Sequence, residues 1–166
     1  VDPKSVTFDT GYGQDAIESF TVFQRLQSED VIPAGVKFQV CMPTPLAPGY
    51  NFVSPSAQDD FIPVYTDHII GEVRKIVDTI PHARLSIQWD VCQEVLMWED
   101  YYDYDRPGYK EEIFSVLAQI GDGVPADVEL GYHLCYGSPR DEHLVQPKDT
   151  FNMVEMMHGI AAAVNR

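Results

Sequence analysis

The chain alternates between short apolar runs and longer segments with helical periodicity. Residues 35–45, 83–94 and 127–137 hold apolar runs rich in β-branched and aromatic residues, which is typical of buried strands. Residues 5–13 form a shorter β-rich run that ends in glycines. The pattern therefore predicts four strands along the chain.

Amphipathic helical segments follow these runs. Apolar residues recur three or four positions apart in residues 14–30, in the second part of residues 61–80, in residues 110–124 and in residues 149–165. Asp149 is predicted to cap the last segment, since its side-chain oxygen can accept a hydrogen bond from a free backbone N–H of the first turn. The pattern thus predicts one helix after each strand.

Two further segments are predicted to be long loops. Residues 46–59 are rich in Pro, Ser and Gly, and residues 95–109 are acidic and rich in Tyr. Both come after a predicted strand, whereas the connections from a helix to the next strand are short. In a TIM barrel, the strand-to-helix loops build the active face.

Four βα units in succession predict an α/β fold with a parallel sheet and helical crossovers. The loop lengths favour a TIM (β/α)8-type barrel, but a complete barrel has eight strands and about 250 residues. This chain has 166 residues. We therefore expect residues 1–166 to form one incomplete barrel domain, which a homo-oligomer or a complementary half barrel would complete.

Composition narrows the classes of partner. The hydrophobic content of 45% allows a packed core, and the formal net charge is -15. So much negative charge argues against binding to nucleic acids and to anionic membrane surfaces, whose phosphates attract Lys and Arg. No apolar span of membrane length and no signal-peptide pattern occurs, so a cytoplasmic location is expected.

Three cysteines, Cys41, Cys92 and Cys135, are spread along the chain. An odd number at wide spacing does not indicate a disulfide scaffold. Cys41 and Cys92 lie in apolar runs and are predicted to be buried structural thiols.

Polar or reactive residues stand at the predicted C-terminal ends of three strands. Functional residues of βα barrels come from these ends. The candidates are Thr44, Gln88 and Asp90 for substrate binding, Asp90 and Glu94 for catalysis, and His133 and Cys135 for metal binding.

Asp90 ends a strand that should be largely buried, so its carboxylate needs a partner. One interpretation is a helix N-cap or a hydrogen bond within a loop. The other is a carboxylate that holds the amine or hydroxyl group of a substrate.

His133 and Cys135 are two residues apart, so on a strand their side chains point to the same face. Imidazole and thiolate are both good ligands of Zn²⁺. The alternative for His133 is a hydrogen-bonded histidine in the core. Glu155 on the last helix could supply a third ligand, or could lie on a solvated helix face.

The order of these strand ends resembles a known family. "IQWD" at residues 87–90 and "YHLCYGS" at residues 132–138 resemble two strands of the cobalamin-independent methionine synthase (MetE)-like group. "KFQVCMPTP" at residues 37–45 is similar to that family's preceding substrate strand. "GYGQDAIESFTVFQRL" at residues 11–26 is similar to a helix of uncharacterised members of the uroporphyrinogen decarboxylase/MetE-like superfamily.

This resemblance implies a barrel and a zinc-dependent transfer of a methyl or alkyl group to a thiol. In that family the His and Cys bind zinc, which activates homocysteine as a thiolate, and methyltetrahydrofolate donates the methyl group. Carried over here, His133 and Cys135 would bind zinc, and Asp90 would hold the amino group of an amino-acid substrate.

The chain departs from the family at two positions. The family's Asp-Glu-Pro-Ala is here Asp90-Val91-Cys92-Gln93, and its final Cys ligand does not occur up to Arg166. Two other hypotheses therefore stand beside methyl transfer. One is a metal-free decarboxylase or lyase, for which Arg106 and Arg140 are the loop cations available. The other is a non-catalytic barrel fragment or partner subunit.

Overall fold

The computed structural model describes residues 6–102 and 107–166. Together these residues form an α/β fold with three strands and six α-helices. In chain order, the elements are α1 (Tyr12–Ser28), β1 (Phe38–Pro43), α2 (Leu46–Phe52), α3 (Pro55–Thr79), β2 (Leu85–Val91), α4 (Gln93–Trp98), α5 (Tyr109–Asp122), β3 (Glu129–Leu134) and α6 (Phe151–Ala163).

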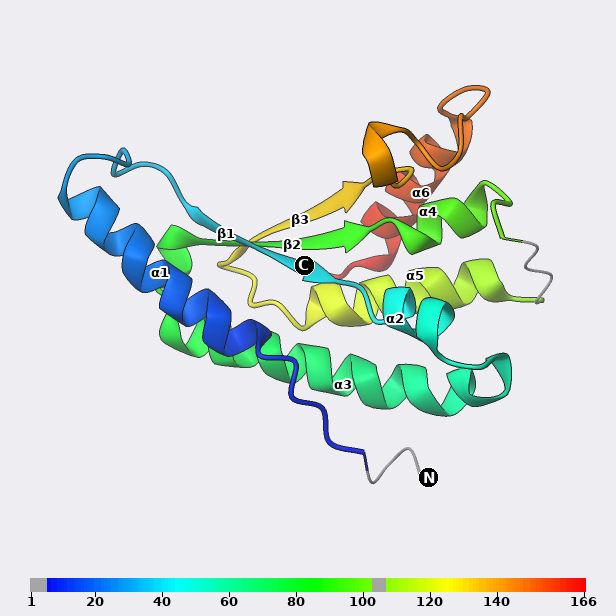
Figure 1. The fold of residues 1–166 in the computed structure, drawn as a ribbon, viewed down its shortest axis with the longest axis horizontal. Helices are drawn as coiled ribbons and strands as arrows, with labels where there is room; N and C mark the ends of the chain where they lie inside the picture. The colour runs from blue at the N-terminus through cyan, green and yellow to red at the C-terminus, as the bar shows by residue number, and fades with distance from the viewer. Residues whose placement is uncertain (1–5, 103–106) are drawn as a thin grey trace.

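The strands form one parallel sheet in the order β1-β2-β3. Parallel neighbours need a crossover connection, and such connections are right-handed. Because the strand order always advances in the same direction, successive crossovers fall on the same face. Figure 1 shows α1, α3 and α5 together on one side of the sheet. The opposite face carries no helix among the described residues.

The helix-covered face holds the core. Met42 of β1 and Ile87, Trp89 and Val91 of β2 are all fully buried there. Ile69, Val73 and Ile76 of α3 and Ile113, Leu117 and Ile120 of α5 close the core from the other side. Side chains alternate along a strand, so Gln88 and Asp90 must point to the other face.

The prediction of an α/β fold with parallel strands is confirmed, and β1, β2 and β3 lie within three of the four predicted runs. The prediction of a strand in residues 5–13 was wrong, because the described part of this segment contains no strand. The ring of Phe8 lies 5.7 Å from that of Phe61 and 5.1 Å from that of Tyr65, both on α3. This segment therefore packs its partly buried aromatic side chain against a helix and not in the sheet.

Both predicted long loops contain helices that periodicity did not reveal. The first contains α2 and the start of α3, and α2 tolerates its Pro48 because that residue lies in the first turn. The second contains the end of α4, a helix in which all six residues are buried. A helix buried on every side has no polar face, so its sequence shows no amphipathic period.

The cap of the last helix is close to the prediction. Asp149 Oδ1 accepts a hydrogen bond of 2.8 Å from the backbone N–H of Phe151, while Thr150 occupies the N-cap position. Asp149 is thus the residue that caps the backbone, as predicted, but the N-cap position lies one residue later than predicted.

The contact between α5 and α6 depends on a glycine. A Cβ atom at Gly159 of α6 would overlap with the ring of Phe114 on α5. We expect Gly159→Ala to lower the free energy of unfolding by about 1–3 kcal/mol, despite the better helix propensity of alanine. Urea denaturation would measure this change. Gly71→Ala is the matched control, since nothing lies within 4 Å of a Cβ atom there; an equal loss in both variants would contradict the prediction.

The two outer strands each have a single neighbour in the sheet. Beside β3, a groove of about 490 Å³ opens between that strand and α6. Its apolar lining comes from Leu130, Tyr132 and Leu134 of the strand and from Met157, Ile160, Ala161 and Val164 of the helical segment. Beside β1, a smaller groove of about 230 Å³ lies against α1. Within the part of the chain that is described, no helix is long and apolar enough to cross a bilayer.

Candidate functional site

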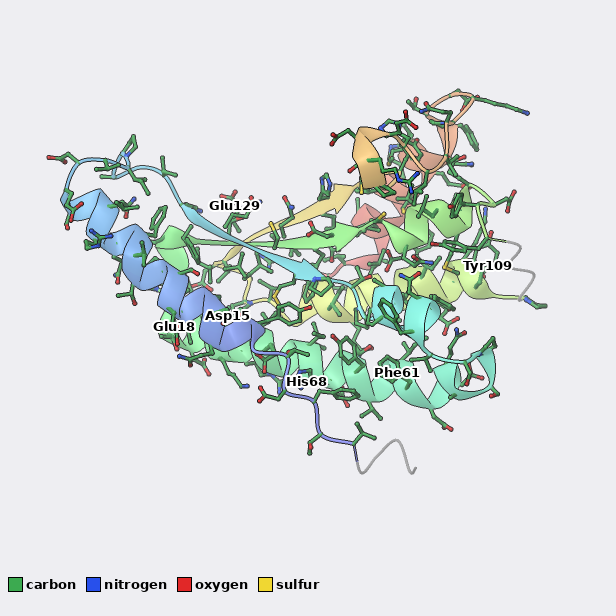
Figure 2. The ribbon with its side chains drawn as sticks, viewed as in Figure 1. Asp15, Glu18, Phe61, His68, Tyr109 and Glu129 are labelled. Carbon is green, nitrogen blue, oxygen red and sulfur yellow. The ribbon has the colours of Figure 1, made fainter. Side chains whose placement is uncertain are left out.

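The helix-free face of the sheet carries a connected row of polar side chains. Gln39 Nε2 donates to Gln88 Oε1 at 3.1 Å, and Gln88 Nε2 donates to Asp90 Oδ1 at 2.9 Å. Gln88 Nε2 also lies 3.4 Å from the Sγ atom of Cys41. Figure 2 labels Glu129, which pairs with Ser86 and lies on the side of the sheet away from α1 and α3. The polar face is therefore open to a ligand.

Asp90 sits where this row reaches the C-terminal end of β2. Its Cα partners are Pro43 on β1 and His133 on β3. The N-cap of α4 is Cys92, and no side chain caps that helix, so Asp90 is not a helix cap. Its partner is the amide of Gln88, which donates to Oδ1, and no other described residue forms a hydrogen bond with its carboxylate.

His133 is exposed and lies beside Asp90 on the same face, so it is not a core histidine. Cys135 follows the end of β3, and its N–H bonds to the carbonyl of Val91 at 3.4 Å. This bond belongs to the last parallel pair, Val91 and Leu134, and Cys92 and Cys135 are the residues that directly follow that pair.

The side chain of Cys135 interacts with the thiol of Cys92. Burial, together with the adjacent Cys135 side chain, raises the pKa of Cys92 to about 12. The prediction that Cys41 is buried was wrong, because its side chain is exposed on the open face of β1. Cys92 and Cys135 are both half-buried.

Thr44 and Glu94 form a second, buried part of the site. Thr44 follows β1, Glu94 lies in the first turn of α4, and both are 0% exposed. Burial raises the pKa of Glu94 from 4.5 to about 7, and the nearby Thr44 hydroxyl opposes that rise. The two groups are close but poorly aligned, since neither the hydroxyl nor either carboxyl oxygen makes a well-formed hydrogen bond. Glu94 can therefore change its charge near neutral pH.

The predicted zinc site does not form from the described residues alone. A catalytic zinc takes three protein ligands and a structural zinc takes four. Over residues 6–102 and 107–166, no group of three or more His, Cys, Asp or Glu side chains is placed to hold a metal ion. Glu155 accepts a 2.7 Å hydrogen bond from the Trp98 indole and lies 3.8 Å from Lys110, so its carboxylate is already engaged. Zinc binding by His133 and Cys135 stays a prediction that requires further ligands.

Of the two cations suggested for a decarboxylase, only Arg140 lies within the described residues. Arg140 is exposed in the turn after β3, and Arg106 lies outside the described residues.

The proximity of Cys92 and Cys135 was not predicted from the sequence. The signal was present in "WDVC" and "YHLC", because each cysteine follows the polar strand-end residue by two positions. Only the register between β2 and β3 brings the two thiols together.

A scan against protein-family models and searches of curated proteins and of solved structures found no match. The resemblance to the MetE-like group therefore rests on the quoted residues alone.

Proposed function

We propose that this chain is a sector of a βα barrel of the MetE/uroporphyrinogen decarboxylase-like type. The supporting observation is the consecutive strand order with, among the described residues, helices on one face of the sheet. In a βα barrel, that arrangement turns the helix-free face inward, and the C-terminal ends of the strands form the active face. Asp90, His133, Thr44 and Glu94 all lie at or just beyond those ends.

The open face is suited to an amino-acid substrate. Among the described residues, Asp90 has a hydrogen bond to Oδ1 alone, from Gln88 at 2.9 Å, so Oδ2 remains for a substrate group. A substrate ammonium group would find there a charge-assisted hydrogen bond, which is stronger than a neutral one. His133 and Gln39 provide further polar contacts on the neighbouring strands.

The reaction that we favour is the transfer of a methyl or alkyl group to the thiol of a homocysteine-like substrate, with methyl-folate as a candidate donor. Such a transfer requires the thiol to lose its proton. Glu94 has a pKa near 7 and could accept a proton at neutral pH, directly or through water. Zinc would make the thiol more acidic if it were bound, but the described residues do not complete a zinc site.

A metal-free lyase is the second candidate, and Glu94 favours it. A fully buried carboxyl group with a raised pKa is a typical general acid. In this case Glu94 would donate a proton to the carbon that loses a substituent, while Asp90 would again bind the substrate.

Asp90→Asn tests the binding proposal. We expect the variant to bind L-homocysteine roughly tenfold more weakly than the wild type, or worse, because it loses a charge-assisted hydrogen bond. Isothermal titration calorimetry would measure the two dissociation constants.

Glu129→Gln is the matched control. It removes one negative charge from the same sheet face, but at the N-terminal end of β3, where Glu129 pairs with the exposed Lys37. Equal weakening in both variants would indicate a general charge effect and would overturn the proposed role of Asp90. No binding to the wild type would favour the hypothesis of a non-catalytic fragment or partner subunit.

A further inference from the structure

Two cysteines from different parts of the sequence lie side by side at the C-terminal ends of β2 and β3. Val91 pairs with Leu134 in the parallel register, and the N–H of Cys135 bonds to the carbonyl of Val91. Cys92 and Cys135 directly follow this last pair, and Cys92 is the N-cap of α4. Each comes two positions after a residue of the open face, Asp90 or His133.

The separation across this pair suits a covalent bridge. Adjacent strands lie about 4.8 Å apart, and the Cα atoms of bridged cysteines are separated by about 4.4–6.8 Å. The Cys92 thiol lies close enough to Cys135 for the two side chains to interact. Both are free thiols, and neither is fully buried.

The backbone beside the two cysteines leaves little space around the sulfur atom of Cys92. A Cβ atom at Gly137 would lie 3.5 Å from Cys92 Sγ and would clash with Leu144, and Gly137 has a φ of +67°. The turn after β3 therefore passes close over the Cys92 sulfur. A small oxidant reaches such a sulfur more easily than a bulky one.

The third cysteine, Cys41, is too distant to form an intramolecular disulfide with Cys92 or Cys135. Cys41 pairs with Gln88, which precedes Cys92 by four positions on β2. Four residues of strand span roughly 13 Å, far beyond the length of a disulfide.

We propose that Cys92 and Cys135 form a redox-active cross-strand dithiol that a hydroperoxide converts into a disulfide. One sulfur attacks a peroxide oxygen, the O–O bond breaks, and a sulfenic acid and water form. The second sulfur then attacks the sulfenic sulfur, the S–S bond forms, and hydroxide leaves with the proton of that thiol as a second water. Overall, two thiols and one hydrogen peroxide give one disulfide and two water molecules.

This inference does not depend on the proposed transferase or lyase activity. The bridge would join the ends of β2 and β3 beside Asp90 and His133. It would also remove Cys135 as a metal ligand, so the reduced and oxidised forms would differ in any metal binding at this position.

The test is peroxide oxidation of the reduced protein followed by tryptic mapping. The three cysteines fall in three different tryptic peptides, so each possible link has its own mass. We expect a monomer that loses two of its three free thiols and contains only the peptide that joins Cys92 to Cys135. Cys41→Ser should form the same link, and Cys92→Ser and Cys135→Ser should form no intramolecular link.

Three outcomes would overturn the proposal: a link through Cys41, a disulfide between two chains, or over-oxidation of the thiols without any link. If a serine variant fails to fold, the wild-type peptide map alone still decides. Treatment with a reducing thiol should restore all three free thiols, and failure to do so would contradict the assignment of a reversible dithiol.

Discussion

Trp89→Ala is expected to lower the free energy of unfolding by about 3–5 kcal/mol. Trp89 is 0% exposed in the central strand, where it packs between the sheet and the helices. Truncation to alanine would leave a large cavity that rigid neighbours on both sides cannot fill. Urea denaturation followed by circular dichroism would measure the change.

Two variants control for the loss of an aromatic ring. Phe52→Ala removes a ring that is 86% exposed, and we expect a change within about 0.5 kcal/mol. Trp89→Phe should cost clearly less than Trp89→Ala, because it keeps most of the ring and removes an indole N–H that has no partner. If Trp89→Ala changed stability no more than Phe52→Ala, the placement of β2 in the core would be wrong.

The second large effect concerns Glu94 and pH. Burial raises the pKa of its carboxyl group from 4.5 to about 7, so the folded state favours the protonated form. The stability that this preference contributes is fully present below pH 4.5. It is lost as the pH rises to about 7, because the unfolded chain ionises first. The difference of about 2.5 pKa units corresponds to roughly 3 kcal/mol.

Glu94→Gln resembles the protonated side chain and cannot ionise. The free energy of unfolding of the variant, relative to that of the wild type at the same pH, should therefore rise by roughly 3 kcal/mol between pH 4 and pH 8. Most of this rise should occur between about pH 4.5 and 7. The measurement is the free energy of unfolding of both proteins across this pH range. Glu129→Gln, at an exposed position, should follow the wild type at every pH. A constant difference between Glu94→Gln and the wild type would show that Glu94 has an ordinary pKa.

The strands of this fold were predictable because each is a short apolar run. Residues 85–91 are buried at five of seven positions, so the run is visible without knowledge of its neighbours. Thr7 and Phe8 have the same strand preference, but local propensity cannot tell that Phe8 packs against Phe61 on α3. Whether such a segment joins a sheet depends on tertiary contacts.

Some features of the candidate site could likewise be predicted from the sequence, whereas others depend on tertiary contacts. The common face of Gln88 and Asp90 follows from alternation along one strand. The contact between Cys92 and Cys135 and the burial of Glu94 beside Thr44 depend on how separate elements are placed. One buried helical turn, α4, positions Glu94, and its sequence resembled a loop.

The sheet edges described above have a consequence for molecular recognition. The outward N–H and C=O groups of β1 and β3 offer the same hydrogen bonds to any extended polypeptide, whatever its sequence. Discrimination between neighbours must therefore come from the side chains that fill the adjoining grooves, such as the apolar one beside β3. A strand that matches the backbone ladder but leaves that groove empty would give up most of the hydrophobic contribution to binding. The specificity of strand pairing at this edge thus depends on the side chains that fill the groove, whereas backbone hydrogen bonding stabilises any strand that binds there.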